Sequence, residues 1–361
     1  MKKFICVFPR GENVHLIKDV GLIPYFLFKG GYFDCSIAFY AEQDNLSYLQ
    51  NEVRGLRYQK IKRRTKNDHL NVFFFLLTRI ISMDIVMLFH PNYYSLSVAY
   101  LIKILSFNRI KFYFKMDLDS TFDFDGLYKK SWKRLIFNFL MRKINLLSAE
   151  AYEDCKQFEK IGEFTVKHIP NGLIPVENNS FFKENILLTV GRLGSYQKDT
   201  QTLLKAFAIA NPKKVKLVLI GPLEGDFNSF VQEYFKRYPH LKDKIEFKGS
   251  IGVREELMSY YRRSKFFVLP SRHEGFPLVL LEAIANGCFI LSSDFPAARD
   301  VVNNGLFGRL FKVEDHLALA DLIVQIDESS FVLPEPKDIA EVAAKKYDWA
   351  EIAREIYLNL K

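Results

Sequence analysis

The segment Phe266–Gly287, with the sequence FFVLPSRHEGFPLVLLEAIANG, joins a short apolar run to a longer one through a polar loop. Phe266–Leu269 is short and rich in strand-forming residues, so we expect a buried strand there. We expect a helix over Leu278–Asn286, with Pro277 at its first position and Gly287 just after its end. A strand that leads through a loop into a helix is typical of parallel α/β sheets.

The same alternation of strands and helices extends over the rest of the chain. In the second half, further strands are expected over 186–190, 215–220, 245–248, 289–292 and 309–311, and helices over 200–210, 228–237, 254–263, 297–303 and 316–326. In the first half, strands are expected over 4–7, 34–39, 84–88, 111–115 and 145–148. Apolar strands that alternate with helices predict parallel sheets covered by helices on both faces.

Chain length and turn-forming residues predict two domains. The 361 residues exceed the roughly 100–200 of a single domain, and Gly162–Pro175 is rich in Gly and Pro. We therefore expect an N-terminal Rossmann-like domain over 1–165 and a C-terminal one over 170–340. Ligands of such α/β domains bind beyond the carboxyl ends of the strands, which predicts a site in a central cleft between them.

Positive charge is concentrated in the first half of the chain. Residues 1–170 carry 26 Lys and Arg against 17 Asp and Glu, a net charge of +9, so the remainder of the chain is neutral. One basic cluster lies within Arg54–Lys66. A second surrounds Trp132 and contains Lys129, Lys130, Lys133, Arg134, Arg142 and Lys143. A basic amphipathic helix with aromatic residues can lie on an anionic membrane, but it can equally be a solvated face over an ordinary core.

Cysteine spacing and hydropathy predict the compartment. Cys6, Cys35, Cys155 and Cys288 are scattered and form no CxxC pair, which favours neither a disulfide framework nor a zinc site. The sequence has no secretory signal and no apolar stretch of about 18 residues. We therefore expect a cytoplasmic protein that is soluble or held only peripherally at the cytoplasmic face of the inner membrane.

Two further groups of residues suggest chemistry. In the loop Gly191–Asp199, Arg192 and Lys198 follow an expected strand, where two cations could clamp a diphosphate or could simply be solvated. Glu274 lies at the expected positive end of a helix, a place suited to phosphate or sugar oxygens. Glu282 lies within an apolar helix, where an ionised carboxylate needs partners such as ribose hydroxyls or a structural ion pair.

Taken in order, these motifs resemble glycosyltransferase family 4, whose members have the GT-B fold and retain the anomeric configuration. Glu274 and Glu282 match the family's Glu-x7-Glu signature, and the match extends over about Ala149–Phe311. The other matching pieces are 169–172, 190–192, Lys198, 203–207, 219–221, 247–249, 268–271, Gly287 and Gly308. The segment 347–360 resembles the family's closing helix, which packs back onto the N-terminal domain.

The resemblance implies a role for each matching residue. Arg192 and Lys198 would hold the donor diphosphate, Glu274 would contact the transferred sugar, and Glu282 would bind the ribose. The backbone near the sugar and phosphate would come from Gly191, Gly275, Phe276, Pro277 and Leu278, and the nucleobase would face Lys248, Gly249 and Ile251. A UDP-sugar is favoured over a GDP-sugar as the donor, and neither a metal nor a cofactor is implied.

The N-terminal half departs from the family pattern. Where the family often carries a His-Asp pair, this chain reads Lys115-Met116-Asp117, so that Met116 replaces the His. His90 or Lys115 could substitute for it beside Asp117, or neither matters. The pattern Asp117-Leu118-Asp119 also matches the DxD metal motif of another glycosyltransferase fold, although a match of three residues is weak evidence.

The resemblance implies a retaining, metal-independent glycosyltransferase that moves a sugar to a glycan or lipid-linked acceptor in bacterial capsule or lipopolysaccharide synthesis. Its partners would be the nucleotide-sugar donor, the acceptor and an anionic membrane surface. One alternative is a catalytically inactive scaffold that binds sugar nucleotides. A nucleic-acid-binding protein is the other, which the pI near 9.1 permits, but the sequence carries no nucleic-acid motif.

Overall fold

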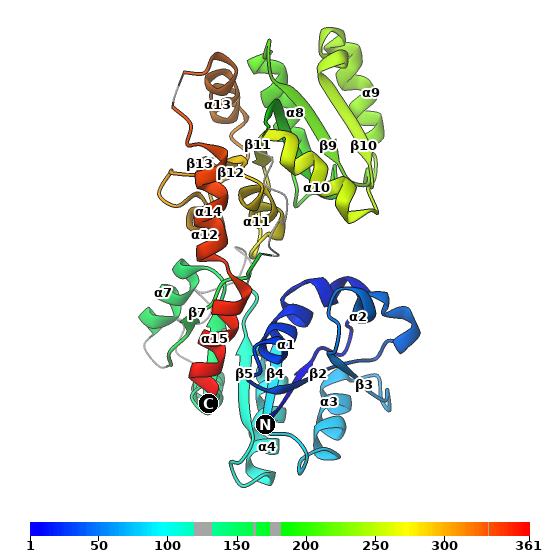
Figure 1. Cartoon of the computed structure of the whole chain (residues 1–361), viewed down its shortest axis with the longest axis vertical. Coiled ribbons are helices and arrows are strands. Elements are labelled where there is room, and N and C mark those ends of the chain that lie inside the picture. The colour runs from blue at the N-terminus through cyan, green and yellow to red at the C-terminus, as the bar shows by residue number, and fades with distance from the viewer. Residues whose placement is uncertain (119–131, 162–163, 174–181, 331) are drawn as a thin grey trace. The chain divides into compact units, whose positions relative to one another are not determined.

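The computed structural model describes residues 1–118, 132–161, 164–173, 182–330 and 332–361. These residues form two compact units (Figure 1). The N-terminal unit contains residues 1–118, the described residues of 132–172, and Tyr347–Lys361. The C-terminal unit contains the described residues from Leu173 to Lys346. The last helix therefore belongs to the N-terminal unit, and part of the Gly- and Pro-rich stretch 162–175 lies outside the described residues.

The N-terminal unit is built on a seven-stranded parallel sheet in the order β3-β2-β1-β4-β5-β6-β7. The strands are β1 (Lys3–Val7), β2 (Asp34–Phe39), β3 (Arg57–Lys60), β4 (Ile85–Phe89), β5 (Lys111–Lys115), β6 (Leu146–Ala149) and β7 (Lys167–His168). Five of them confirm the expected strands. The sequence did not predict β3 and β7, because β3 is a polar strand at the edge of the sheet and β7 has only two residues.

Helices cover this sheet on both faces. They are α1 (Asp19–Lys29), α2 (Ser47–Asn51), α3 (Asp68–Leu77), α4 (Tyr93–Leu105), α6 (Trp132–Met141), α7 (Tyr152–Ile161) and α15 (Trp349–Leu360). The inner sides of α3, α4, α6 and α7 share one apolar core with Ile5 and Val7 of β1. Cys6, which points to the other face, donates its thiol proton to Val20 of α1, and α15 packs against α1.

The C-terminal unit is built on a six-stranded parallel sheet in the order β10-β9-β8-β11-β12-β13. The strands are β8 (Glu184–Val190), β9 (Lys216–Ile220), β10 (Ile245–Gly249), β11 (Ser264–Leu269), β12 (Phe289–Ser293) and β13 (Gly308–Phe311). All six were expected from the sequence. The GT-B fold class, two parallel-sheet Rossmann-like units, is therefore confirmed.

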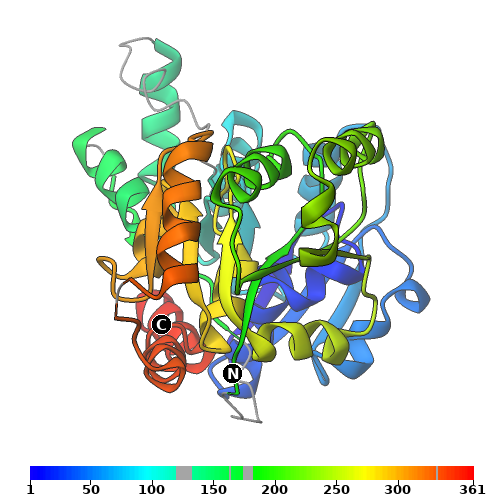
Figure 2. The ribbon, with the colours of Figure 1, turned by 90° about the horizontal axis from the view of Figure 1, so that it is seen from above.

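The helices of this unit also match the expected ones within two residues. They are α8 (Thr200–Ala210), α9 (Phe227–Arg237), α10 (Arg254–Arg263), α11 (Leu278–Ala285), α12 (Pro296–Val302) and α13 (His316–Glu328), with α14 (Pro336–Lys346) in addition. In Figure 2, α8, α9 and α13 line one side of the sheet and α10 lies on the other. One detail was wrong: Pro277 caps α11 from outside, with an extended ψ of 114°, and the first helical residue is Leu278.

Each sheet reverses its strand order beside its first strand. In the N-terminal unit the reversal lies between β1 and β4, and in the C-terminal unit between β8 and β11. Loops on either side of such a point diverge to opposite faces of the sheet and leave a crevice at the carboxyl ends of the strands, where ligands of open α/β sheets bind. None of the helices in the described part of the chain combines the length and apolarity needed to cross a bilayer.

Candidate active site

Two loops meet at the reversal point of the C-terminal sheet. The loop Gly191–Asp199 follows β8, and the loop Pro270–Pro277 follows β11. Arg272 joins them, because its backbone N–H donates to the carbonyl of Gln197 (2.8 Å) and its guanidinium lies 3.0 Å from the buried carboxylate of Asp199. The two segments that the sequence singled out therefore form one continuous surface.

Lys198 and Glu274 are in direct contact at the centre of this surface. The ammonium nitrogen of Lys198 lies 2.5 Å from Oε1 of Glu274, and the hydroxyl of Ser271 donates to the same oxygen at 2.6 Å. The amide of Gln197 donates to the other carboxylate oxygen at 3.2 Å. Both side chains of the ion pair are mostly buried. A carboxylate has about four acceptor positions, so Glu274 retains capacity for a ligand hydroxyl.

Arg192 reaches the same group through Gln197. Its Nη2 donates to the side-chain oxygen of Gln197 at 2.9 Å, and the amide nitrogen of Gln197 donates to the carbonyl of His273 at 3.1 Å. The guanidinium of Arg192 is more than half exposed, so it can also contact a ligand. Gln197 therefore connects Arg192 to Glu274. Sequence reasoning missed this residue because one polar side chain in a loop carries no spacing signal.

The segment expected near the nucleobase lies along the same edge of the sheet. Gly221, which follows β9, donates its N–H to the carbonyl of Gly249 at 2.8 Å. A Cβ at Gly221 would lie 1.8 Å from the carbonyl oxygen of Gly191, and its φ is +139°, so only glycine fits. This contact brings the end of β10, with Lys248, and the turn after it, with Ile251, toward the loop after β8.

The helix α11 places Glu282 close to the same edge. Four of its eight residues, among them Leu281 and Ala283, are buried, whereas Glu282 itself is half-buried, so the helix is less enclosed than its apolar sequence suggests. Within the described residues, Tyr261 is the hydrogen-bond donor to this carboxylate, at 3.0 Å. Burial raises the pKa of Glu282, while the charge of Arg254 and the bond from Tyr261 oppose that rise. Among the described residues the carboxylate of Glu282 therefore has one hydrogen-bond donor, and its other acceptor positions can take a ligand hydroxyl.

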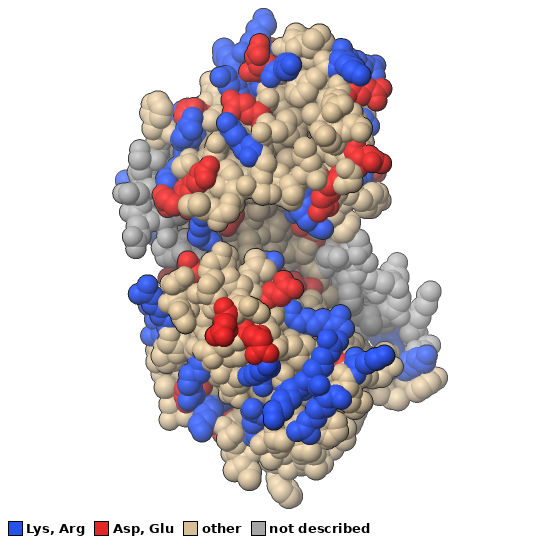
Figure 3. Space-filling view, turned by 90° about the vertical axis from the view of Figure 1, so that its right-hand side faces the viewer, with Lys and Arg blue, Asp and Glu red and all other residues tan. Residues whose placement is uncertain are grey.

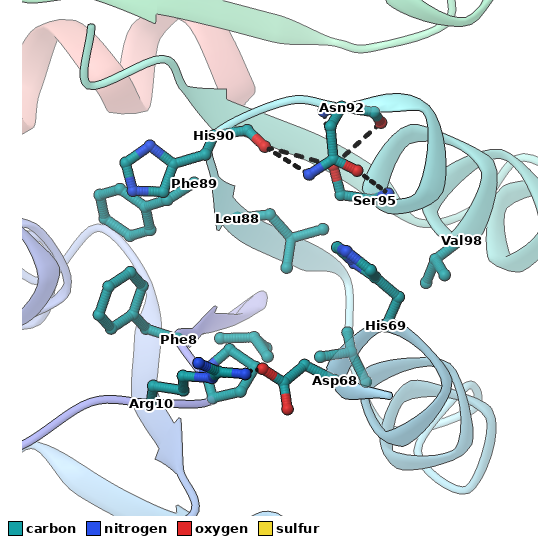
Figure 4. Close-up of a pocket in the computed structure, with 13 residues that line it drawn as sticks. Phe8, Arg10, Asp68, His69, Leu88, Phe89, His90, Asn92, Ser95 and Val98 are labelled. Atoms are coloured by element: carbon teal, nitrogen blue, oxygen red, sulfur yellow. Dashed lines mark hydrogen bonds and ion pairs between the residues drawn. The ribbon is translucent and has the colours of Figure 1, made fainter. Parts of the chain in front are cut away.

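The reversal point of the N-terminal sheet holds a cavity of about 270 Å³ (Figure 4). Its walls are mostly apolar, and Phe8 and Phe89 lie on one side of it (Figure 4). Arg10 and Asp68 form an ion pair of 2.6 Å at its border, and the imidazole of His69 faces the cavity from α3. A pocket with apolar walls and a few polar groups is typical of a small-molecule site.

His90 and Asp117 lie close together in the N-terminal unit. They follow the neighbouring strands β4 and β5, and Nε2 of His90 is 3.6 Å from Oδ2 of Asp117. Both residues have positive φ angles, 50° and 44°, and such backbone strain in residues other than glycine clusters at functional sites. Both side chains are accessible to a ligand.

Lys115, by contrast, does not face a ligand, and its tentative assignment to the site is wrong. Its side chain is 0% exposed, and its ammonium lies 2.9 Å from Glu150 and 3.9 Å from Asp19. Burial alone would lower the pKa of Lys115, but the two carboxylates outweigh burial and raise it. The lysine is therefore a buried cation that is paired with Glu150 and Asp19 at the carboxyl end of β5.

No group of three or more His, Cys, Asp or Glu side chains in the described residues is arranged to hold a metal ion. Asp119 of the DxD-like pattern lies outside those residues. What the described residues do provide is two cations, two held carboxylates and a helix N-terminus along one sheet edge. Such a set can bind a phosphorylated, hydroxyl-rich ligand.

Residues 173–346 match the family model described as "Glycosyl transferases group 1". The chain is 30% identical to an alpha-monoglucosyldiacylglycerol synthase of Streptococcus pneumoniae, over 49% of this chain and 39% of that protein. It is 32% identical to the amylovoran biosynthesis glycosyltransferase AmsD of Erwinia amylovora, over 34% of this chain and 33% of that protein. The chain thus spans less than half the length of these curated relatives.

Among solved structures, the chain resembles HepE of Anabaena in complex with UDP. The TM-score is 0.74 with 17% identity, and the alignment covers 100% of this chain and 99% of that one. At this identity the likeness concerns the fold alone.

Proposed function

We propose that the chain is a retaining glycosyltransferase that uses a nucleoside-diphosphate sugar, because residues 173–346 match the family model of glycosyl transferases group 1. The observation that carries the proposal is the cluster at the β8/β11 edge, where Gln197 connects Arg192 to the Lys198–Glu274 pair. A diphosphate requires paired cations, and a sugar requires fixed acceptors for its hydroxyls. This cluster provides both within one set of hydrogen bonds.

In the proposed reaction the bond between the anomeric carbon and the nucleoside diphosphate breaks, the acceptor hydroxyl oxygen bonds to that carbon from the same face, and its proton passes to the leaving phosphate oxygen. Arg192 and Lys198 stabilise the negative charge that develops on the leaving phosphate, and the N-terminus of α11 adds its partial positive charge. Glu274 orients the sugar and Glu282 holds the ribose. These side chains would neutralise the diphosphate without a metal ion, and no protein nucleophile is required.

We propose a UDP-sugar as the donor and a lipid-linked or glycan acceptor in a surface polysaccharide pathway. Support comes from the UDP bound to the HepE structure and from the lipid and polysaccharide products for which the two relatives are named. The acceptor would use the N-terminal unit, whose cavity lies at the sheet reversal point. The four cysteines are buried and form no disulfide, which fits the reducing cytoplasm where we place the reaction.

Thermal unfolding in the presence of UDP, GDP, ADP and a short oligonucleotide, each with and without EDTA, tests the donor site. A ligand at about 100 times its Kd stabilises the folded state by roughly 2.7 kcal/mol. We expect UDP to raise the midpoint equally with and without EDTA. We expect Lys198→Ala to remove most of this shift, because it leaves the diphosphate and Glu274 without their cation.

Lys205→Ala is the matched control, because Lys205 is an exposed lysine on the neighbouring helix α8. It should keep the full UDP shift. The proposal fails if UDP, GDP and ADP all leave the midpoint unchanged, or if both lysine variants lose the shift equally. A UDP effect that disappears with EDTA would contradict the metal-independent part alone.

An inactive scaffold that binds sugar nucleotides is the second candidate, and one observation favours it. Met116, which stands where the related enzymes often have His, is buried beside the equally buried Lys115. We favour an active enzyme in which His90 and Asp117 supply the missing pair. Slow hydrolysis of a UDP-sugar should then occur and should fall by about 10²-fold in His90→Ala, whereas UDP binding without any hydrolysis or transfer would support the scaffold.

A further inference from the structure

The three helices α3, α4 and α6 form one layer that is apolar on both sides. Their inner sides pack on the sheet in a single core. Their outer sides also carry large apolar residues at helical spacing: Leu70, Leu77 and Ile81 along and after α3, Leu101, Ile104 and Leu105 along α4, and Trp132, Leu135, Ile136 and Phe139 along α6. We call this outer set the apolar face. Spacings of three, four and seven residues place the members within each helix on one side of it, and Ile81 follows the end of α3.

Several side chains of the apolar face are largely exposed to solvent. Trp132 is 67% exposed and Leu135 is 68% exposed, and Phe107, just beyond α4, is nearly fully exposed. Ring contacts between Tyr100 of α4 and Phe139 of α6 show that the rows on the two helices are neighbours. Contiguous exposed apolar residues on this scale mark an interaction surface.

A helix of the other unit provides an internal comparison. The exposed residues of α9 are all polar: Asn228, Ser229, Gln232, Glu233, Lys236 and Arg237. Like α3, α4 and α6, this helix covers one face of a parallel sheet. The helices α8 and α13 beside it carry the single exposed apolar residues Ile209 and Leu317, so the exposed apolar rows of the N-terminal unit are not repeated on α9.

Charge around the apolar face is positive. The three helices contain one acidic residue, Asp68, and it is paired with Arg10. The ammonium groups of Lys133 and Lys143 lie over the rings of Trp132 and Phe139, at 5.9 and 5.2 Å. Cations held at the border of an apolar surface can remain at the depth of lipid phosphates while the rings enter the bilayer.

Beside α3 lies a cavity of about 260 Å³ whose lining includes Lys60, Lys62, Arg64 and Arg79. Lys60 also pairs with Glu42, and Arg79 stacks on the ring of Phe75. Figure 3 shows the band of Lys and Arg on the side of the N-terminal unit that carries β3 and α3. Such a cavity suits the phosphate of a lipid headgroup.

We propose that the apolar face, with the flanking cations and the basic cavity, docks the N-terminal unit onto the surface of an anionic lipid bilayer. The inference rests on the proposed function in one respect: a lipid-linked acceptor lies in a membrane, and docking would bring the chain to it. A second copy of the chain fits the face less well, because a symmetric contact would bring two positive surfaces together. Lys129 and Lys130, named from the sequence as part of this surface, lie outside the described residues.

The two tryptophans of the chain make a direct test possible. Trp132 is largely exposed, whereas Trp349 is 1% exposed and packed in the N-terminal unit. The full chain is mixed with vesicles of phosphatidylcholine alone or of phosphatidylcholine with phosphatidylglycerol, and sedimentation and tryptophan emission are followed. We expect sedimentation with the anionic vesicles, weakening at high salt, together with a blue shift of the emission. Trp132→Phe should lose the blue shift but still sediment.

Substitutions with a matched control distinguish vesicle binding through the apolar face from non-specific adsorption of the chain. Leu135→Asp should weaken binding to the anionic vesicles at least about tenfold, because it removes an apolar contact and adds a repelled charge. Leu317→Asp replaces a leucine that is 59% exposed on α13 of the C-terminal unit, and it should bind like the unmodified chain. Arg64→Glu, in the basic cavity, should weaken binding to anionic vesicles and leave the weak binding to neutral vesicles unchanged.

Three results would overturn the proposal. The first is no sedimentation and no change in emission with anionic vesicles. The second is equal loss of binding in the variants of Leu135 and Leu317. The third is a dimer in light scattering that depends on Leu135 without any vesicle binding, which would make the face a contact between copies. The UDP thermal shift is measured on each variant: a retained shift without vesicle binding refutes the docking surface alone, whereas an absent shift in the unmodified chain refutes the proposed function.

Discussion

The residue with the clearest link between environment and ligand is Glu282. Its half-buried side chain projects from α11, burial raises its pKa, and the charge of Arg254 and the hydrogen bond from Tyr261 act against that rise. An ionised carboxylate accepts hydroxyl donors better than a neutral one, so binding of a ribose should weaken as the pH falls toward the pKa of Glu282. The pH at which binding begins to weaken on the acid side, here called the acid limb, therefore reports the pKa of Glu282.

We therefore predict a shift of the acid limb in Tyr261→Phe. Removing the hydroxyl withdraws a bond that favours the charged carboxylate, so the pKa of Glu282 rises further and UDP affinity begins to fall at a higher pH. Calorimetric titration of UDP across the acid range gives the measurement. Glu282→Gln is the reference, because it retains the titration of the UDP phosphate but lacks the carboxylate. If UDP affinity falls at the same pH in Tyr261→Phe and in the unmodified chain, Glu282 does not hold the ribose.

At the same scale, the sequence predicted which residues would form the site better than it predicted how they are connected. Arg192, Lys198 and Glu274 were expected because they follow strands and match an ordered motif. Their connection through Gln197 depends on the loops after β8 and β11 meeting in space, which no local spacing encodes. The N-terminal choice between His90 and Lys115 also required the structure, because the alternation of a strand does not determine how deeply its last residue is buried.

At the scale of elements, the strands of the C-terminal unit were predictable because each is an apolar run flanked by turn residues. The strand β3 was missed because Arg57-Tyr58-Gln59-Lys60 carries no apolar alternation. It is an edge strand, and polar side chains at an edge discourage pairing with other chains. Its Arg57 and Lys60 belong to the band of Lys and Arg on this side of the unit, so the strand contributes charged side chains to the surface rather than apolar side chains to the core.

One contact between elements has a measurable pH dependence. Asp327, at the end of α13, accepts backbone N–H bonds from Lys213, Lys214 and Val215 at 2.7, 2.6 and 2.8 Å. Burial raises the pKa of Asp327, but these bonds outweigh burial and lower it below its ordinary value. Because the pKa is depressed in the folded state, the stabilisation is complete above the unfolded pKa of about 3.9 and is lost as the pH falls through the folded value.

We predict that Asp327→Ala lowers the free energy of unfolding by about 2–3 kcal/mol at pH 7, since three backbone donors lose a charged acceptor. The difference from the unmodified chain should shrink steadily in urea unfolding below pH 4. Asp321→Ala, an exposed position on the same helix, should stay within about 0.5 kcal/mol. A difference between Asp327→Ala and the unmodified chain that does not change with pH would mean that the carboxylate stabilises the unit through packing alone.

At the scale of the whole molecule, the chain returns to its first unit after completing the second. The helix α15 was expected from the sequence to pack back onto the N-terminal domain, and its residues lie in the N-terminal unit. Trp349 stacks on Phe26 of α1 with ring centres 5.9 Å apart, and Tyr357 stacks on Tyr32 at 4.8 Å. A Cβ at Gly172 would lie 2.5 Å from the indole ring, so glycine is needed where the chain leaves this unit.

Through these contacts Trp349 helps to hold the returning helix on α1. We predict that Trp349→Ala destabilises the chain by about 3–5 kcal/mol, because it leaves a large cavity between α1 and α15. Trp349→Phe should cost much less, since it keeps an aromatic ring against Phe26 and removes an indole N–H that is buried without a partner in the described structure. Hydrogen exchange localises the effect: in Trp349→Ala the amides of α1 should exchange faster, whereas those of β11 should not. Faster exchange in β11 as well would show that the returning helix stabilises both units. An equal loss of unfolding free energy in Trp349→Ala and Trp349→Phe would show that the stabilisation depends on the indole itself and not on the volume that the side chain fills.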